Sequence, residues 1–234
     1  MEDRDEKILR HIGLYYISLR LTLEHVFFDG NKIACGNVIT RLTKQNRIVT
    51  RPRAFPKGLS YYQLTEAEAK KLRIPEYRAK APAGQSLPEK LAILWFCCMN
   101  QKKRTRLEKE KIAEIFSGQA FSGHHCYEQD AESKSYRIYR IFPPSADDEY
   151  LTRQVREHID AVTERECYDW LKTQVYGVAL LVETKARRDN LIRQLHERGI
   201  SERYHCLVEV VPTAETLKEF IDAFTPTPTS ADSK

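Results

Sequence analysis

No acidic residue occurs between Gly30 and Thr65, although Asp and Glu make up 33 of the 234 residues. The same 36 residues contain seven Lys and Arg residues. Residues 1–80 hold 16 basic against 9 acidic residues, whereas residues 81–234 hold 22 basic against 24 acidic ones. A surface this free of negative charge indicates a polyanionic partner, because Lys and Arg side chains that neutralise phosphates release counterions on binding.

Other features are also missing. No run of 18 apolar residues occurs, so no membrane-spanning helix and no membrane partner are expected. The charged start MEDRDEKILR lacks the apolar middle of a signal peptide, which predicts a cytoplasmic protein. The six cysteines form no CxxC pair and fit no zinc-finger spacing, so we expect free thiols. Without a Walker loop, GxGxxG or GxSxG, nucleotide hydrolysis, a dinucleotide cofactor and serine hydrolase chemistry have no support.

The first part of the chain has the apolar spacing of helices. "EKILRHIGLYYISLRLTLEHVFF" predicts two helices with a break near Ser18–Arg20, and a third helix follows from about Ile33 to Gln45. Cys35, Ile39 and Leu42 form the inward stripe of this third helix. Gly36 within it suggests the close approach of another backbone.

Two strands are predicted next. They are "RIVTR" and "LSYYQLT", and the prolines of the intervening "PRAFPKG" exclude a regular strand there. Thr65 and Glu68 have the spacing of a capping box for the helix "EAEAKKL".

This order of elements is that of a winged helix-turn-helix. In that fold the third helix enters the major groove of DNA, and the loop between the strands is the wing. Residues 1–80 are therefore predicted to be a DNA-binding domain. The candidate DNA contacts are Lys32, Asn37, Thr40, Arg41, Lys44, Arg47, Arg51, Arg53 and Lys57. A protein-interaction module with a merely solvated basic face is the competing interpretation.

A linker at Lys80 to Pro88 leads to a predicted mixed α/β domain, residues 81–224, followed by a compositionally disordered tail, 225–234. Its expected elements are a helix "PEKLAILWFCCMNQ", hairpin strands at 124–130 and 136–142, a long helix at 148–173, a strand "YGVALLVET", a helix "ARRDNLIRQLHERG", a strand "YHCLVEVVP" and a last helix "TAETLKEFIDAF".

The stretch "QKKRTRLEKEKIAEIF" is predicted to be basic at its start and helical after it, with Thr105 and Glu108 in capping-box spacing. Its basic residues either extend the DNA-binding surface or form an ordinary solvated start of a helix. They are Lys102, Lys103, Arg104 and Arg106.

An enzymatic alternative depends on "VETK". Glu183 and Lys185 have the (D/E)xK spacing of metal-dependent nucleases, in which a carboxylate binds Mg²⁺ and the Lys assists the attacking water. A second carboxylate, Glu128 or Asp130, serves only if the hairpin lies beside Glu183. Otherwise neither a catalytic residue, a metal nor a cofactor is expected.

His124 and His125 are not expected to share a metal, because adjacent side chains on a strand point to opposite faces.

The whole layout resembles the replication-relaxation family of plasmids and mobile elements. The residues that carry this resemblance are "HVFFDGNKIACGNVITRLTKQNRIVTRPR", "YYQLTEAEAKKL" and "VALLVETKARRDNLIRQL". The resemblance implies a winged helix followed by a restriction-endonuclease-like α/β domain. In nuclease-like members the hairpin carries carboxylates, whereas here Arg137 and Arg140 stand in the second strand. That departure implies a degenerate site and a scaffold role for the second domain.

These observations predict a two-domain, α+β or α/β, cytoplasmic protein that binds double-stranded DNA and is not an enzyme. It would regulate transcription or assist the replication or transfer of a mobile element. A homodimer and proteins of replication or transfer are further expected partners. The alternatives are a Mg²⁺-dependent endonuclease or relaxase and a protein-binding adaptor.

Overall fold

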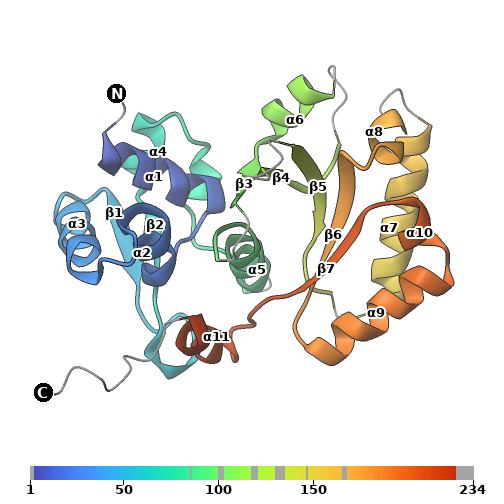
Figure 1. Ribbon diagram of the computed structural model, residues 1–234. Coiled ribbons are helices and arrows are strands. Elements are labelled where there is room, and N and C mark those ends of the chain that lie inside the picture. Colours follow the sequence, from blue (N-terminus) through green and yellow to red (C-terminus); the bar gives the residue numbers. More distant parts are fainter. Residues whose placement is uncertain are drawn as a thin grey trace, which may run out of the picture. The chain divides into compact units, whose positions relative to one another are not determined.

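The computed structural model describes residues 3–84, 86–99, 103–116, 121–129, 135–145, 147–164 and 168–224. The fold is mixed α+β, with a two-stranded and a five-stranded sheet among the described residues. The chain divides into two compact units (Figure 1). Unit 1 consists of the residues up to Gly84 and those from Pro212 on, and unit 2 consists of Gln85–Val211. The sequence-based boundary at residues 80–81 lies four residues earlier, and it assigned residues 212–224 to the other domain.

Unit 1 begins with the three expected helices. The break between the first two and the extent of the third are confirmed within one or two residues. Its elements are α1 (Arg4–Tyr15), α2 (Arg20–Phe28), α3 (Lys32–Lys44), β1 (Ile48–Arg51), the 3₁₀ turn η1 (Pro56–Gly58), β2 (Tyr61–Leu64), α4 (Glu66–Lys71), the 3₁₀ turn η2 (Glu76–Arg78) and α11 (Leu217–Phe224).

One hydrophobic core holds these elements together. Apolar residues at helical spacing face inward from each of the first three helices, and both strands contribute to the same cluster. Its most buried members include Leu9, Ile12, Leu23, Cys35, Leu42 and Leu64.

Strands β1 and β2 form an antiparallel ribbon in which Ile48 lies opposite Leu64. Ser18, between α1 and α2, adds an antiparallel bridge to Tyr62 of β2. Thr65 then caps α4, because its side chain accepts a hydrogen bond from the Glu68 N–H at 3.3 Å. This part of the predicted capping box is confirmed.

The last helix, α11, belongs to unit 1. Leu217 at its start is fully buried. At its end the Phe224 ring packs edge-on against His25 of α2, with ring centroids 5.0 Å apart. Unit 1 is therefore discontinuous in sequence.

Unit 2 is built on the five-stranded sheet. Its elements are α5 (Ser86–Cys98), β3 (Lys103–Leu107), α6 (Lys109–Ile115), β4 (His124–Gln129), β5 (Tyr136–Phe142), α7 (Asp148–Thr163), α8 (Tyr168–Lys172), β6 (Tyr176–Val182), α9 (Lys185–Glu197), α10 (Ile200–Arg203) and β7 (Cys206–Val210).

The strand order is β3-β4-β5-β6-β7. The pairs β3–β4 and β4–β5 are antiparallel, and the pairs β5–β6 and β6–β7 are parallel. Helix α7 connects β5 to β6 and α9 connects β6 to β7, as parallel pairing requires. The predicted hairpin strands, the buried strand β6 and the strand β7 are confirmed, while the expected hairpin turn at 131–134 lies outside the described residues.

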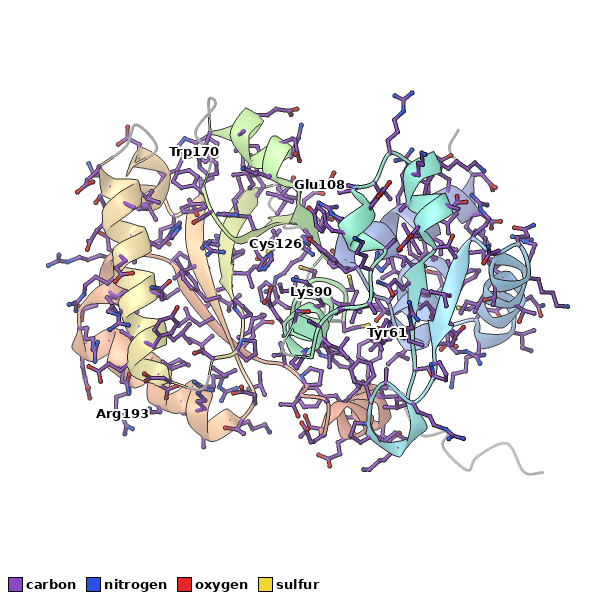
Figure 2. All side chains as sticks on the ribbon, turned by 180° about the vertical axis from the view of Figure 1, so that it is seen from behind. Tyr61, Lys90, Glu108, Cys126, Trp170 and Arg193 are labelled. Atoms are coloured by element: carbon purple, nitrogen blue, oxygen red, sulfur yellow. The ribbon has the colours of Figure 1, made fainter. Side chains whose placement is uncertain are left out.

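Helices cover both faces of this sheet. Figure 1 shows α5 on one face and α7 and α9 on the other. Cys126 of β4 faces α5, the helix that carries Lys90 (Figure 2). The pKa of the Cys126 thiol is raised well above its usual value. The larger cause is burial, and the second is a hydrogen bond with Cys97 of α5. The opposite face packs Val178 and Leu180 of β6 against α7 and α9.

Two expectations for unit 2 are wrong. The predicted helix with a basic start is instead strand β3, and α6 begins only at Lys109 after Glu108, whose side chain makes no capping hydrogen bond. Thr105 is therefore not a helix cap. The long helix expected at 148–173 ends at Thr163, and a separate short helix α8 follows.

The expectation of free thiols is confirmed for the cysteines within the described residues. They are Cys35, Cys97, Cys98, Cys126 and Cys206, whereas Cys167 lies outside these residues. No helix in the described ranges combines the length and apolar character that crossing a membrane requires.

Candidate nucleic-acid interface

Helix α3 starts at a side-chain cap and presents a polar face. The Asn31 side chain accepts a hydrogen bond from the Ala34 N–H at 3.0 Å, which satisfies one of the free donors at the helix start. Cys35, Ile39 and Leu42 are buried, as predicted. The helix is therefore fixed along its inner side, and its outer side is available for contacts.

The outer side of α3 is a stripe of four exposed residues at i, i+4, i+7 and i+11. They are Ile33, Asn37, Thr40 and Lys44. The last three were predicted from the sequence as DNA contacts, whereas Ile33 was not. An isoleucine is normally assigned to a core, and only its helical phase relative to Cys35 and Leu42 could have shown that it points outward.

Gly36 has a different role from the one predicted. A Cβ at this position would lie 3.3 Å from the guanidinium of Arg20, so a side chain and not a backbone approaches the glycine. Arg20 bonds to Glu24 at 2.8 Å and donates to the Lys32 carbonyl at 3.1 Å. It thereby links α2 to the first turn of α3.

The loop between β1 and β2 is anchored at its centre. Phe55 is 3% exposed and packs against Tyr61, with ring centroids 6.1 Å apart. The Phe55 N–H donates to the Leu59 carbonyl at 3.1 Å. These contacts fix the middle of the loop, while Arg53 and Lys57 on either side are exposed.

Both of these cations have an unusual backbone conformation. Arg53 has φ 54° and Lys57 has φ 58°, in the left-handed region that residues with a Cβ rarely occupy. Such a conformation costs on the order of 1 kcal/mol per residue relative to glycine. Strain of this kind often accompanies function.

Two predicted DNA contacts are paired with carboxylates from outside the acid-free segment. Arg41 directs one terminal nitrogen to both carboxylate oxygens of Asp5, at 2.6 and 2.7 Å, while its side chain stays 52% exposed. Arg47 bonds to Glu68 at 2.8 Å and is only 22% exposed. The hydrogen bond that Arg47 donates to the Glu68 carboxylate is the main cause that raises the Arg47 pKa. Arg47 is therefore paired within unit 1 and little exposed, whereas Arg41 is paired but remains half-exposed.

The remaining predicted cations are available to a ligand. Within the described residues, no carboxylate pairs with Lys32, Lys44, Arg53 or Lys57, and each is exposed. Arg51 is half-buried and lies 3.4 Å from the Gln63 amide oxygen. The acid-free sequence thus gives four unpaired cations on α3 and the loop.

Two members of the basic cluster at the start of β3, Arg104 and Arg106, are buried. Arg104 has a side chain with 0% exposure between Glu128 at 2.6 Å and Glu209 at 2.7 Å, and its guanidinium lies 4.0 Å from the Phe96 ring centre. Burial alone would lower the pKa of Arg104, but hydrogen bonds and charges from Glu209 and Glu128 outweigh it, so the pKa is raised.

Arg106 is also buried, at 8% exposure, and lies 3.0 Å from His124. Both predicted roles of the cluster, DNA contact and solvated helix start, are thus wrong for Arg104 and Arg106. Lys102 lies outside the described residues.

The carboxylates proposed for a nuclease lie at opposite ends of the sheet. Glu128 is opposite Arg137 at the start of β5, whereas Glu183 follows the last residue of β6. According to the register of β5 with β6, Glu128 and Glu183 are separated along the strand direction by about eight residues, or roughly 25 Å. A metal ion needs its ligands within about 2–2.6 Å of itself, so these two cannot share one ion.

Glu183 has a different partner. Arg187 bonds to it at 2.7 Å and to Asp148 of α7 at 2.5 Å, which ties the start of α9 to the start of α7. Lys185 is exposed in the first turn of α9. No group of three or more candidate metal ligands occurs among the described residues, from which Asp130 is missing.

The two histidines point to opposite faces of β4, as predicted. His124 contacts Glu89 of α5 at 2.5 Å, whereas His125 contacts the Tyr176 hydroxyl at 3.0 Å. The hydrogen bond from His124 is the main cause that lowers the Glu89 pKa to about 2. Arg140 donates to the backbone carbonyls of His124 and Ile141, and burial lowers its pKa.

Comparison with protein-family models, curated proteins and solved structures finds no match to this chain. The resemblance to the replication-relaxation family therefore stays a prediction. The candidate interface rests on the residues of α3 and the β1–β2 loop alone.

Proposed function

We propose that the protein binds double-stranded DNA through unit 1, in the manner of a winged helix. Helix α3 would lie in the major groove, and the β1–β2 loop would contact the phosphate backbone as the wing. The observation that carries this proposal is the set of four unpaired cations, Lys32, Lys44, Arg53 and Lys57, around a polar helix face.

The topology of unit 1 supports the same binding mode. An isolated β-bridge joins Ser18, between α1 and α2, to Tyr62 of the ribbon. Three helices followed by a two-stranded ribbon, with one backbone bridge from the first connection to the ribbon, is an arrangement expected of a winged helix. In such a domain the loop of the ribbon lies next to the recognition helix.

Arg41 would contribute to specificity. Asp5 engages one of its terminal nitrogens, so the guanidinium is oriented while its other donors remain directed elsewhere. A pre-oriented Arg is well suited to a guanine, which presents two acceptors in the major groove. Asp5 would then be a positioning residue for Arg41.

The biological role that fits this binding is the regulation of transcription, or assistance in the replication or transfer of a mobile element. Unit 2 would support partner contacts and would not cleave DNA. The separation of Glu128 from Glu183 and the pairing of Glu183 with Arg187 argue against the nuclease alternative.

The salt dependence of duplex binding tests the proposal. Four phosphate contacts correspond to a log–log slope of about −3 to −4 in monovalent salt. Fluorescence anisotropy with a labelled random-sequence duplex between about 50 and 300 mM salt measures this slope. Lys44→Ala and Arg53→Ala are each expected to reduce it by about 1, whereas Lys70→Ala, an exposed Lys of α4, leaves it unchanged.

A flat salt response, or equal effects of all three substitutions, would refute DNA binding through this face and favour a protein-interaction module. Incubation of supercoiled plasmid with Mg²⁺ or Mn²⁺ is expected to give no nicking. If nicking occurs and Glu183→Ala abolishes it, the enzymatic alternative is correct.

A further inference from the structure

Ile33 is an apolar residue on an otherwise polar face. Its 78% exposure exceeds that of Val26, Tyr77, Tyr136, Tyr150 and Ile192, the other large hydrophobic residues that are exposed in the described part of the chain. It does not belong to the hydrophobic core of unit 1. Its exposure therefore has no explanation in the packing of the described residues.

The position of Ile33 is that of a base contact. It lies in the first turn of the 13-residue helix α3, one turn before Asn37 and on the same stripe. In helix-turn-helix proteins the N-terminal residues of the recognition helix contact the base edges. Lys32 and Lys44, which lack carboxylate partners in the described residues, lie near the two ends of this stripe.

The chemistry of the stripe selects one kind of base pair. Only thymine presents a methyl group in the major groove, and apolar side chains contact it. An asparagine side chain can form two hydrogen bonds with adenine, through N6 and N7. Ile33 and Asn37, on neighbouring turns of α3, are thus suited to contact a thymine and an adenine, respectively.

We propose that Ile33 contacts a thymine methyl group in the major groove and makes the protein select thymine at that position. This inference rests on the proposed DNA binding by unit 1 and extends it to a specificity-determining residue. Contact between the methyl group and the Ile33 side chain would remove apolar surface of both from water, which is favourable. Ile33 is already exposed, so it would not have to leave the hydrophobic core to make this contact.

The experiment begins with selection from a random pool of duplexes by the full chain. Each thymine of the selected duplex is then replaced, one at a time, by deoxyuridine. This change removes the methyl group and keeps both the base pairing and the O4 acceptor, so it isolates the methyl contact. Binding is compared for the wild type, Ile33→Ala and the control Val26→Ala, which truncates an exposed apolar residue of α2.

At one thymine of the bound site, deoxyuridine is expected to weaken wild-type binding by about three- to tenfold, since one methyl-sized group is worth roughly fourfold. Val26→Ala should show the same loss. Ile33→Ala should bind thymine and deoxyuridine equally at that position. Circular dichroism of both variants checks the fold, which an alanine on an exposed helix position should not disturb.

The failures of the two proposals can be told apart. If the wild type binds duplex with a preferred sequence but tolerates deoxyuridine at every position, the thymine contact is refuted and DNA binding stands. The same holds if Ile33→Ala loses affinity while retaining the deoxyuridine effect. Duplex binding without any selected sequence also refutes the contact. If no salt-dependent duplex binding occurs at all, the proposed function fails, and the inference fails with it.

Discussion

Replacing Arg104 by methionine should destabilise unit 2 and leave the proposed DNA binding by unit 1 unchanged. The Arg104 side chain is fully buried between two carboxylates, of which Glu128 is 6% exposed and Glu209 is 28% exposed. Methionine fills a similar volume, so the main consequence is the loss of positive charge. Glu128 then loses the buried cation that compensates its negative charge, and either burying the charge or protonating the carboxyl group costs free energy.

The expected loss is about 3–5 kcal/mol of the free energy of unfolding, the range found when one partner of a buried ion pair is removed. A value near 3 kcal/mol is the better expectation, because Glu209 can regain some hydration. Adding Glu128→Gln to Arg104→Met should recover part of this loss, since it removes the buried charge. The control Lys111→Met breaks an exposed pair with Glu114 and should have no measurable effect.

Tryptophan fluorescence during urea unfolding is a selective assay. The chain has two tryptophans, and both Trp95 of α5 and Trp170 of α8 lie in unit 2. The loss corresponds to a fall of the midpoint by about 1–3 M urea. If Arg104→Met unfolds like the wild type and instead lowers the salt slope of DNA binding, Arg104 is a DNA contact and its buried position is refuted.

Two further predictions concern the β1–β2 loop and the loss of stability at low pH. Arg53→Gly and Lys57→Gly should leave the free energy of unfolding of unit 1 within about 1 kcal/mol, since relief of the left-handed conformation offsets the added chain entropy, yet each should reduce the salt slope by about 1. Loss of stability without a change in slope would contradict the proposed wing. Because the Glu89 pKa is lowered from 4.5 to about 2, the stability that this group contributes is present above pH 4.5 and is lost as the pH falls toward 2. Glu89→Gln should flatten that part of the pH profile in tryptophan fluorescence, and an unchanged profile would contradict the assignment.

Local patterns predicted much of unit 1. The inward stripe of α3, the break before α2 and the Thr65 cap all depend on residues within a few positions of one another, so the sequence contains the necessary information. The carboxylates that pair with Arg41 and Arg47, in contrast, are distant from them in the sequence. Asp5 lies 36 positions before Arg41, and a count of acidic residues along the chain cannot reveal that the fold brings them together.

Strand β3 was mistaken for the start of a helix for a related reason. "KRTRL" has no alternating apolar residues, because its inward positions are Arg104 and Arg106. Such a strand is stable in a core only when buried carboxylates pair with it, and Glu209 comes 105 positions later. The hydrophobic pattern on which strand prediction depends was therefore absent.

The discontinuity of unit 1 has a consequence for the order of synthesis. Domains usually fold as units while the chain emerges, with the N-terminal one first. Here the residues of unit 2 are complete at Val211, before α11 and its Phe224 ring exist to cover His25. The unit that begins the chain is thus the last to be finished, because a nascent chain completes unit 1 only after every strand of the five-stranded sheet has been made.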